Sequence, residues 1–577
     1  MIKKLMSYIG EYKRDTLLSP ISVTFEVILE VLLPMLMAKV IDNGVEAGNM
    51  NYVVKMGLLM LVVAMLSLAA GPLSGVFAAR ASMGFGKNLR KAMYDNIQDF
   101  SFQNIDHFST SGLVTRMTTD ITNVQMAYMM SIRLLARAPI MIILSWVMTL
   151  VLNKTVAMLF LIVIPLLGGT LIFIAKKAHP HFIKVFDEYD VLNNSVQENV
   201  NASRVVKAFV REDYEIDKFH IISKYVYSLF TKAEKIVAWN SPVMQFTMYV
   251  VILVIVAIGG NSIVTGTMQT GELTSIIVYS LQILMSLMMV TFVFVMIMIA
   301  EASTDRIAEV LNEEPEMQDS DDAVKDVANG EIIFDHVNFS YAGKDGTLSL
   351  KDVCLHIQSG QTIGIIGGTG SAKSTLVQLI PRLYDVTGGA VKVGGVDVRN
   401  YNLEALRDQV SMVLQKNVLF SGTIYENIRW GNESATDEEV QNVCKLAQAD
   451  GFVQEFPNGY NTQIVQGGNN VSGGQKQRLC IARALLKKPK ILILDDSTSA
   501  VDTKTDALIR KAFREEIPDT TKIIIAQRVS SIEDADQIIV LDDGKITGIG
   551  TSKELLKTNE IYREVYESQV KGGAENE

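Results

Sequence analysis

The chain has 577 residues, of which 49% are hydrophobic and 20% are charged, and its formal net charge at pH 7 is -10. This length exceeds one ordinary domain, and the mixture of apolar and charged segments predicts a membrane part joined to a soluble part. The negative net charge argues against nucleic acid as a partner, because phosphate backbones bind basic surfaces.

Six long apolar stretches dominate the first half of the chain. Each can cross a hydrocarbon core of about 30 Å, and backbone in lipid must satisfy its own hydrogen bonds. The sequence therefore predicts six membrane-spanning helices, centred near residues 17–41, 55–79, 130–152, 155–175, 243–265 and 274–300. Lys and Arg concentrate in residues 1–16 and 176–235, while 42–54 has none. By the positive-inside rule, both termini and the long connections are expected in the cytosol.

Two of the connections between these stretches are too charged for lipid and too long for turns. Residues 88–100 and 182–200, which belong to them, keep the helical spacing of apolar side chains. We expect the membrane helices to continue well into the cytosol along these segments. Separate surface helices are the alternative.

Several membrane-embedded residues are candidates for a substrate cavity. Glu26 and Glu30 are four residues apart and share one helix face. Ionised acids within a bilayer are costly and normally face protein or water. They either bond to neighbouring helices at the cytosolic end or face an inward-open cavity that attracts cationic amphiphiles. The sixth stretch offers three further candidates, namely Gln282, Met285 and Met289. They either line such a cavity or simply pack between helices and lipid.

The composition changes after the sixth stretch. Residues 311–330 are acidic, contain Pro and lack periodicity, which is typical of a linker. From residue 331 to 577, short β-rich runs alternate with helical stretches, which indicates an α/β domain with a largely parallel core. The expected divisions are a transmembrane domain over 1–310, a linker over 311–330 and a nucleotide-binding domain over 331–577, the last for the reason given next.

The segment TIGIIGGTGSAKSTLVQLI (362–380) has the pattern of a strand, a Gly-rich turn and a helix. It matches the phosphate-loop template GxxxxGK[ST], except that Ala372 replaces the Gly before Lys373. Backbone N–H groups of such a loop face nucleotide phosphates, the Lys adds a charge, and Ser374 can reach Mg²⁺. Asp495, at the end of an apolar run, fits the acid associated with Mg²⁺. The expected ATP-binding residues of the loop are Gly367, Gly368, Thr369, Gly370, Ser371, Ala372, Lys373, Ser374 and Thr375.

The three cysteines, Cys354, Cys444 and Cys480, all lie in the α/β part and have no metal-ligand spacing. We interpret them as reduced packing residues of a cytosolic domain.

The segment VSGGQKQRLCIARALLKKPKILILDD (471–496) resembles the signature helix and Walker B strand of ATP-binding cassette proteins. With six membrane helices before the cassette, the chain resembles a type IV ABC exporter half-transporter, of the kind found in bacterial multidrug exporters. The resemblance implies a six-helix α-helical transmembrane domain with long cytosolic helical extensions, followed by an α/β P-loop ATP-binding cassette domain.

The same resemblance implies roles for further residues. Tyr341 would stack on adenine, although a buried strand Tyr is the alternative. Gln415 would reach Mg²⁺ and the attacking water, so the expected metal ligands are Ser374, Gln415 and Asp495. Asp502 would lie where the two cassettes of a dimer meet. The signature residues, which would grip the γ-phosphate held by the opposite cassette, are Val471, Ser472, Gly473, Gly474 and Gln475.

Three positions depart from the family's catalytic pattern. Asp496 stands where the family has a catalytic Glu, and Gln527 stands where it has a His that contacts the γ-phosphate. Asp falls roughly 1–1.5 Å short of Glu, and a misplacement of about 1 Å can cost on the order of 100-fold in rate. Gln carries neither a transferable proton nor a positive charge. Ala372 is the third departure and costs roughly 1 kcal/mol if the loop needs a positive φ there.

These departures predict a site that binds ATP and Mg²⁺ but cleaves ATP slowly. Because the signature is intact, we expect a heterodimer with a homologous ABC half-transporter that carries the consensus Glu and His. The leading function is ATP-driven export of amphiphilic small molecules across a bacterial inner (cytoplasmic) membrane. Membrane lipids are expected to contact the protein there. A lipid flippase or a peptide exporter would have the same architecture. A regulatory or channel-like subunit that binds ATP without pumping is the rival, and the intact signature argues against it.

Overall fold

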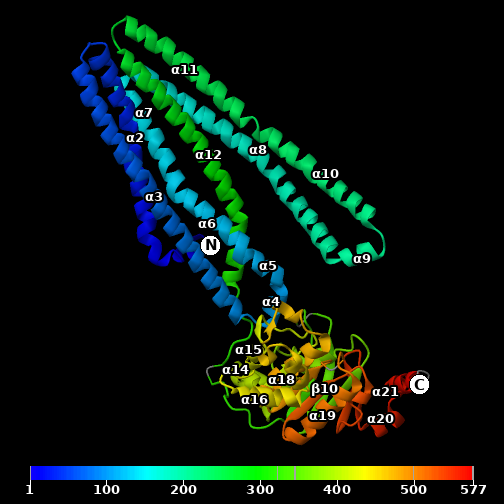
Figure 1. Ribbon diagram of the computed structural model, residues 1–577. Coiled ribbons are helices and arrows are strands. Elements are labelled where there is room, and N and C mark those ends of the chain that lie inside the picture. Colours follow the sequence, from blue (N-terminus) through cyan, green and yellow to red (C-terminus); the bar gives the residue numbers. More distant parts are fainter. Residues whose placement is uncertain (1, 321, 344–345, 498, 575–577) are drawn as a thin grey trace. The chain divides into compact units, whose positions relative to one another are not determined.

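The computed structural model describes residues 2–320, 322–343, 346–497 and 499–574, and the chain divides into two compact units (Figure 1). The first unit comprises Met1–Asp99 and Phe108–Glu313, and the second comprises Phe100–His107 and Glu314–Glu577. The first is helical, and the second combines helices with sheets.

The first unit consists mainly of long helices. They are α1 (Ile2–Ser7), η1 (Gly10–Tyr12), α2 (Lys13–Val40), η2 (Ile41–Val45), α3 (Met50–Asp99), α5 (Thr110–Thr115), η3 (Arg116–Asp120), α6 (Ile121–Met130), η4 (Ser131–Leu135), α7 (Ala136–Leu152), α8 (Lys154–Asn201), α9 (Ser203–Ala208), α10 (Glu212–Val237), α11 (Asn240–Val264) and α12 (Thr270–Asn312). Six described spans are long and apolar enough to cross a membrane, namely Gly10–Val45, Met50–Asp99, Thr110–Leu152, Lys154–Val185, Glu212–Val264 and Thr270–Asn312. The prediction of six membrane helices is confirmed.

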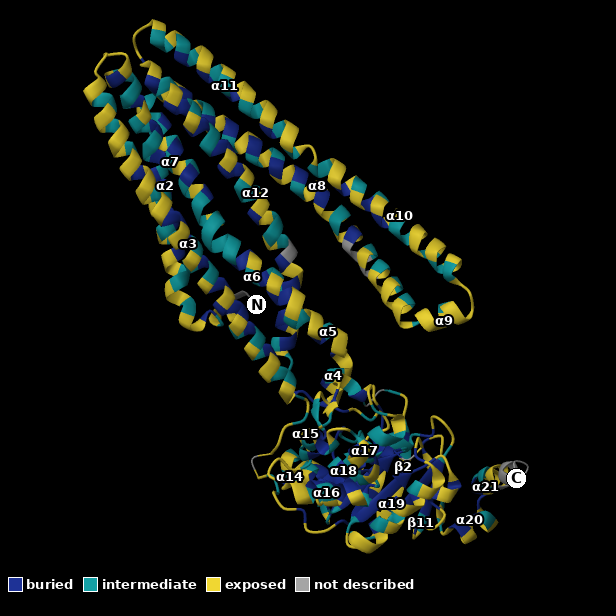
Figure 2. Cartoon of the chain, in the orientation of Figure 1, coloured by how far each residue is buried: buried dark blue, intermediate teal, exposed yellow. Residues whose placement is uncertain are grey.

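The membrane helices continue without a break into the charged connections. Helix α3 has 50 residues and α8 has 48. At 1.5 Å per residue each is about 70–75 Å long, more than twice the thickness of a hydrocarbon core. Continuous helical extensions are therefore present, and the alternative of separate surface helices is wrong. Figure 2 shows exposed residues along much of α3, α8 and α11, where large apolar side chains would meet lipid.

Small residues let the first two membrane helices approach closely. Helix α3 buries residues such as Gly71, Ser74 and Ala78. A Cβ on Gly84 would lie 2.2 Å from the ring of Tyr12, so the ring occupies the space that the missing side chain leaves. Small side chains are the usual means of packing helices in lipid, where no hydrophobic driving force acts between them.

A charged cluster joins α2 to α7 inside the first unit. The Arg137 guanidinium donates to Glu26 Oε1 at 2.6 Å through Nη1, and to Glu30 through Nη2. The exposed fractions of the three side chains are 21%, 15% and 34%, respectively. Two carboxylates against one guanidinium leave this cluster with one net negative charge when all three are ionised. One interpretation of the two acids is that they bond to a neighbouring helix. Arg137 of α7 is such a partner.

The described residues of the second unit form three sheets. The strands are β1 (Ile332–Phe339), β2 (Leu350–Ile357), β3 (Thr362–Gly367), β4 (Gly388–Val393), β5 (Val396–Asp397), β6 (Val410–Val413), β7 (Gly422–Thr423), β8 (Gln463–Ile464), β9 (Ile491–Asp495), β10 (Thr521–Ile525), β11 (Gln537–Asp542) and β12 (Lys545–Gly550). The largest sheet has the order β12-β11-β3-β10-β9-β6, and every pairing in it is parallel except β11 with β12. The others have the orders β2-β1-β4-β5 and β7-β8 and are antiparallel. The predicted α/β domain with a largely parallel core is confirmed.

Helices cover both faces of the largest sheet. The helices of the second unit are α4 (Phe102–Phe108), α13 (Lys373–Gln378), α14 (Leu403–Gln409), α15 (Ile424–Arg429), α16 (Asp437–Leu446), α17 (Asp450–Glu455), α18 (Gly473–Leu486), α19 (Thr503–Glu516), α20 (Ser552–Thr558) and α21 (Glu560–Ala574). Successive strand residues point to opposite faces. In β9, Ile491 and Ile493 join one hydrophobic core, while Leu492 and Leu494 join the other. The first core includes α13 and the β2-β1-β4-β5 sheet, and the second includes α15 to α19.

The cysteine prediction is partly wrong. Cys444 and Cys480 are buried in the second core, as packing residues should be. Cys354 is exposed on β2, because its strand neighbours Val353 and Leu355 take the inward positions.

The charged cluster of the membrane unit generates a stability prediction. Arg137→Met should destabilise the protein by about 3–5 kcal/mol, because it leaves Glu26 and Glu30 as uncompensated carboxylates in the interior. Thermal unfolding of the purified protein in detergent micelles measures this. The matched control is the triple variant Arg137→Met, Glu26→Gln and Glu30→Gln, which removes all three charges and should unfold at a higher temperature than the single variant. If the two variants are equally destabilised, the unpaired carboxylates do not lower the stability of the protein, and the prediction is contradicted.

Candidate nucleotide-binding site

The candidate site lies where the parallel strands of the largest sheet end. Strand β3 ends at Gly367, β9 ends at Asp495, and β10 ends at Ile525, two residues before Gln527. Ile525 pairs with Asp495 on one side and with Ile365 on the other. Ligands of open α/β sheets bind outside the carboxyl ends of such strands. Three separate segments of the predicted site therefore meet at one edge.

The phosphate loop curls around its lysine. Lys373 Nζ donates to the carbonyl oxygens of Gly367 at 2.8 Å and Gly368 at 2.7 Å, and to Ser371 Oγ at 3.3 Å. Burial lowers the pKa of Lys373, and the charges of Asp495 and Asp496 oppose that shift. An ammonium already placed at the centre of the loop is available to phosphate oxygens, which would replace the carbonyl acceptors.

Glycine is required at the start of the loop. A Cβ on Gly367 would lie 2.1 Å from the Leu541 carbonyl oxygen of neighbouring β11, whereas a Cβ on Gly368 or Gly370 would meet nothing within 4 Å. Thr369 is exposed beside these last two glycines, while Ser371 and Thr375 are buried. The middle of the loop is thus open on the side where a phosphate would approach.

Ala372 occupies a left-handed backbone conformation. Its φ is 70° and its ψ is 26°, at the N-cap position of α13. A Cβ makes this conformation costly by roughly 1–2 kcal/mol, which is why the template has Gly there. The departure noted from the sequence is therefore a strained one.

Two oxygen ligands lie together at the base of the loop. Ser374 Oγ donates to Asp495 Oδ1 at 3.0 Å. Asp495 is only 2% exposed, and burial raises the pKa of its carboxyl, against the opposing effects of the Ser374 bond and Lys373. Gln415 is exposed and follows β6, whose Val413 pairs with Leu494 of β9. Hydroxyl, carboxylate and amide oxygens suit Mg²⁺, which keeps further positions for water and phosphate, so these residues fit the ion.

Asp496 and Gln527, the two residues expected to depart from the family's catalytic pattern, contact each other. Gln527 Nε2 donates to Asp496 Oδ2 at 2.8 Å. The Asp496 N–H donates to the Ile525 carbonyl oxygen at 3.1 Å, and Asp496 itself has a φ of 50°. One carboxylate oxygen of Asp496 is thus engaged by the Gln527 side-chain amide.

Tyr341 lies just past the end of β1 and is 47% exposed, so the alternative of a buried strand Tyr is wrong. Its hydroxyl lies 3.0 Å from Thr375 Oγ1 and donates to Gln378 Oε1 at 3.3 Å, which places the side chain against α13. An exposed ring beside the phosphate-loop helix can offer a face to a base.

Residues that the sequence did not single out support this ring. Tyr384 packs edge-on against Tyr341, with centroids 5.2 Å apart, and its hydroxyl donates to Asp106 of α4 at 2.8 Å. Burial and the bond to Asp106 raise the pKa of Tyr384. The ring of Phe102 lies 6.1 Å from that of Tyr384. No sequence spacing signals this contact, because Asp106 and Tyr384 are 278 positions apart.

The signature residues form the start of α18. Ser472 and Gln475 make a capping box, in which each side chain bonds the other's backbone N–H. A Cβ on Gly474 would lie 2.8 Å from the Ala500 carbonyl oxygen, so glycine is needed for this close approach. Gln477, which the sequence did not single out, accepts a hydrogen bond from the Ala500 N–H at 3.1 Å. The remaining signature residues are Val471, which packs at the edge of the second core, and Gly473.

Asp502 caps α19. Its carboxylate accepts from the Thr505 N–H at 2.9 Å and from the Thr505 hydroxyl at 2.7 Å, and these bonds lower the pKa of Asp502. The side chain is fixed at the surface of the second unit, and its expected position between two cassettes stays a prediction.

The predicted cavity residues occupy mixed environments. Glu26 and Glu30 bond to Arg137, as described above. Gln282 Oε1 accepts from Ser145 Oγ at 3.1 Å, which joins α12 to α7. Met285 is exposed and Met289 is half-buried. The polar residues Glu26, Glu30 and Gln282 thus each bond to a neighbouring helix. A role of these residues in substrate binding stays a prediction.

Comparison with known proteins agrees with this geometry. The family described as "ABC transporter transmembrane region" matches residues 16–287, and the family described as "ABC transporter" matches residues 350–499. The uncharacterized ABC transporter ATP-binding protein YfiB of Bacillus subtilis (strain 168) is 38% identical over 568 residues, covering 98% of each chain. The chain belongs to the ABC transporter family. Its domains make it an ABC exporter, and family membership implies use of ATP, usually with Mg²⁺.

Two further relatives add detail. The ATP-dependent lipid A-core flippase of Desulfotalea psychrophila (strain LSv54 / DSM 12343) is 32% identical over 495 residues, covering 86% of each chain. A bacterial Atm1-family ABC exporter with ATP bound has the same fold, with a TM-score of 0.84, 23% identity, and coverage of 97% of this chain and 99% of the other. Bacterial relatives and six spans are consistent with an inner-membrane location.

The strain at Ala372 predicts an effect on nucleotide affinity. We expect the loop without nucleotide to leave this strained conformation part of the time and ATP to require it. Ala372→Gly should then tighten ATP binding by up to about fivefold, or roughly 1 kcal/mol. The affinity is measured with a fluorescent ATP analogue on purified protein. Gly370→Ala is the matched control, because Gly370 has a φ of 83° and open space around an added Cβ, so this variant should weaken binding by strain alone. An unchanged affinity in Ala372→Gly would show that the strain does not bear on binding.

Proposed function

We propose that this chain is one half of a heterodimeric exporter of amphiphilic compounds, in which it contributes a degenerate ATP site and an intact signature. The observation that carries the proposal is the pair of Asp496 and Gln527, which replaces the family's catalytic Glu and His beside a complete phosphate loop.

The pair is poorly suited to hydrolysis. Cleavage needs a water held in line with the γ-phosphate and a group that orients it. The Asp496 carboxylate is one methylene shorter than Glu, and Gln527 already bonds one of its oxygens. Gln527 cannot supply positive charge to the phosphate oxygens. Binding residues such as Lys373 and Ser374 remain, so ATP is held but turned over slowly.

A second cassette is needed to complete the site. Helix α13, which follows the phosphate loop, and α18, which begins with the signature, pack in hydrophobic cores on opposite faces of the sheet. The chain's own Ser472 and Lys373 are therefore suited to two different nucleotides rather than one. Each nucleotide then lies between the phosphate loop of one subunit and the signature of the other.

The partner is a homologous half-transporter with the consensus Glu and His. Two copies of this chain would form two impaired sites, whereas a heterodimer pairs this intact signature with a competent partner site. Both termini and the nucleotide-binding domain lie in the cytosol, in line with the distribution of Lys and Arg.

One feature of the membrane unit supports the proposed substrate class. The Glu26–Arg137–Glu30 cluster carries one excess negative charge, which would favour amphiphiles that carry a positive charge. Lipid flipping is the second candidate, favoured by the 32% identity to the lipid A-core flippase.

The first test of this function concerns the two ATP sites. Purified alone, the chain should show little ATPase activity, and the pair should be active. In the pair, Asp496→Asn should change the rate by less than about twofold, while Glu→Gln at the partner's catalytic position should reduce it by on the order of 100-fold or more. Steady-state phosphate release measures both. Robust turnover by the isolated chain, or equal damage from the two changes, would contradict the proposal.

The second test concerns the substrate. Glu30→Gln removes the excess negative charge, while Arg137 keeps Glu26 as its partner. Transport of cationic dyes should therefore fall by about fivefold, which corresponds to about 1 kcal/mol. Transport of neutral dyes should persist. Dye efflux from vesicles containing the reconstituted pair measures this. Loss of both dye classes together, with ATPase retained, would argue against electrostatic selection.

A further inference from the structure

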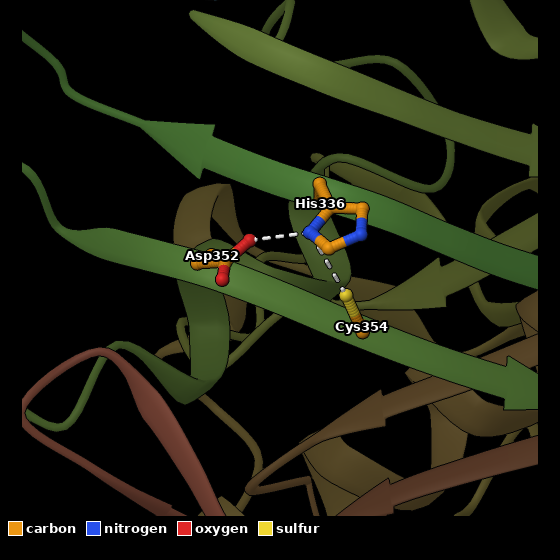
Figure 3. Close-up of side chains that lie close together, drawn as sticks. All are labelled: His336, Asp352 and Cys354. Atoms are coloured by element: carbon orange, nitrogen blue, oxygen red, sulfur yellow. Dashed lines mark hydrogen bonds and ion pairs between the residues drawn. The ribbon is translucent and has the colours of Figure 1, made fainter.

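Three metal-binding side chains meet on the exposed face of the four-stranded sheet, outside the nucleotide site. Strand β2 turns Val353 and Leu355 inward, so Asp352 and Cys354 face outward. Antiparallel pairing of Val337 with Val353 brings His336, one residue before Val337, opposite Cys354. Figure 3 shows the three side chains directed toward one another from the two strands.

The distances suit a small metal ion. His336 Nδ1 lies 2.7 Å from Asp352 Oδ1 and 3.5 Å from Cys354 Sγ, and the three ligand atoms all lie within 4.8 Å of one another. Tetrahedral Zn²⁺, with bonds of about 2.0–2.3 Å, places its ligand atoms about 3.3–3.6 Å apart. The nitrogen and sulfur already have this separation. The carboxylate oxygen lies closer to the nitrogen than a shared ion would hold it, so the exposed Asp352 side chain must move away from the imidazole by about half an ångström or more to make room for the ion.

Strand pairing and the Asn338 side chain together hold the backbone that carries these ligands. Asn338 accepts a hydrogen bond from the Asp352 N–H at 3.0 Å and donates to the His336 carbonyl oxygen at 3.3 Å. His336 and Asp352 both have left-handed backbone, with φ of 49° and 52°, and His336 lies at an irregularity in the β1–β2 pairing. Asn338 thus holds the two strands in the arrangement that brings imidazole and carboxylate together.

We propose that His336, Asp352 and Cys354 form a Zn²⁺ site, with water completing the coordination. Nitrogen, oxygen and sulfur donors together are the ligand set of Zn²⁺ rather than of Mg²⁺ or Ca²⁺, which take oxygen. The site joins β1 to β2 a few residues before Tyr341, so a bound ion clamps the strand that leads to the candidate adenine-binding ring.

The test uses the full-length chain in detergent micelles, titrated with Zn²⁺ against a chromophoric zinc chelator. We expect one Zn²⁺ per chain, and a loss of affinity of at least tenfold in Cys354→Ser and in His336→Gln. The matched control is His356→Gln, because His356 is an exposed histidine of the same strand face that also lies beside a carboxylate, Glu331, at 2.8 Å. It should leave the affinity unchanged.

A second readout requires no variant. Zn²⁺ should protect Cys354 of the native chain from alkylation by a maleimide, as located by peptide mass spectrometry, whereas Mg²⁺ should not. Zn²⁺ binding that survives Cys354→Ser, equal weakening by His356→Gln and His336→Gln, or alkylation of Cys354 at the same rate with and without Zn²⁺ would overturn the assignment.

Discussion

The parallel pairing of β10 with both β3 and β9 is the constraint on which the nucleotide site depends. It brings the ends of three strands to one edge, so that Gly367, Asp495 and Gln527 stand together although their positions in the chain are far apart. Parallel strands buried on both faces are rich in apolar side chains, and the runs ILIL of β9 and III of β10 have this composition. Hydrophobic burial and backbone pairing thus position the polar side chains of the site.

The same sheet separates the two functional loops of the domain. Alternate strand residues enter different cores, and these cores hold the phosphate-loop helix on one face and the signature helix on the other. This division is the physical basis of the proposal that a second cassette completes each nucleotide site. Asp496 and Gln527 lie beside this phosphate loop, whereas the α18 capping box belongs to the other face, so the proposed defect would be confined to one of the two loops.

Among the described residues, four of the ten non-glycine residues with positive φ lie at the two sites proposed for this protein. Ala372 and Asp496 have positive φ at the nucleotide site, and His336 and Asp352 have it at the proposed metal site. Such conformations persist only where the surrounding structure holds them, as β-sheet pairing and Asn338 do here. In the membrane unit, Arg137 compensates two acids that lipid would not tolerate alone.

The sequence by itself determined the six membrane helices, the α/β class of the second unit and the motif segments of the nucleotide site. Hydrophobic length, strand and helix periodicity, and the template around Lys373 are local patterns, and local patterns can be read along the chain. Only the tertiary structure decided that Gln527 bonds Asp496, that Arg137 pairs with Glu26, and that Cys354 is exposed opposite His336. No local sequence pattern indicates that these residues contact one another. They depend on strand register and helix packing, which are set by the burial of the whole core rather than by any one segment.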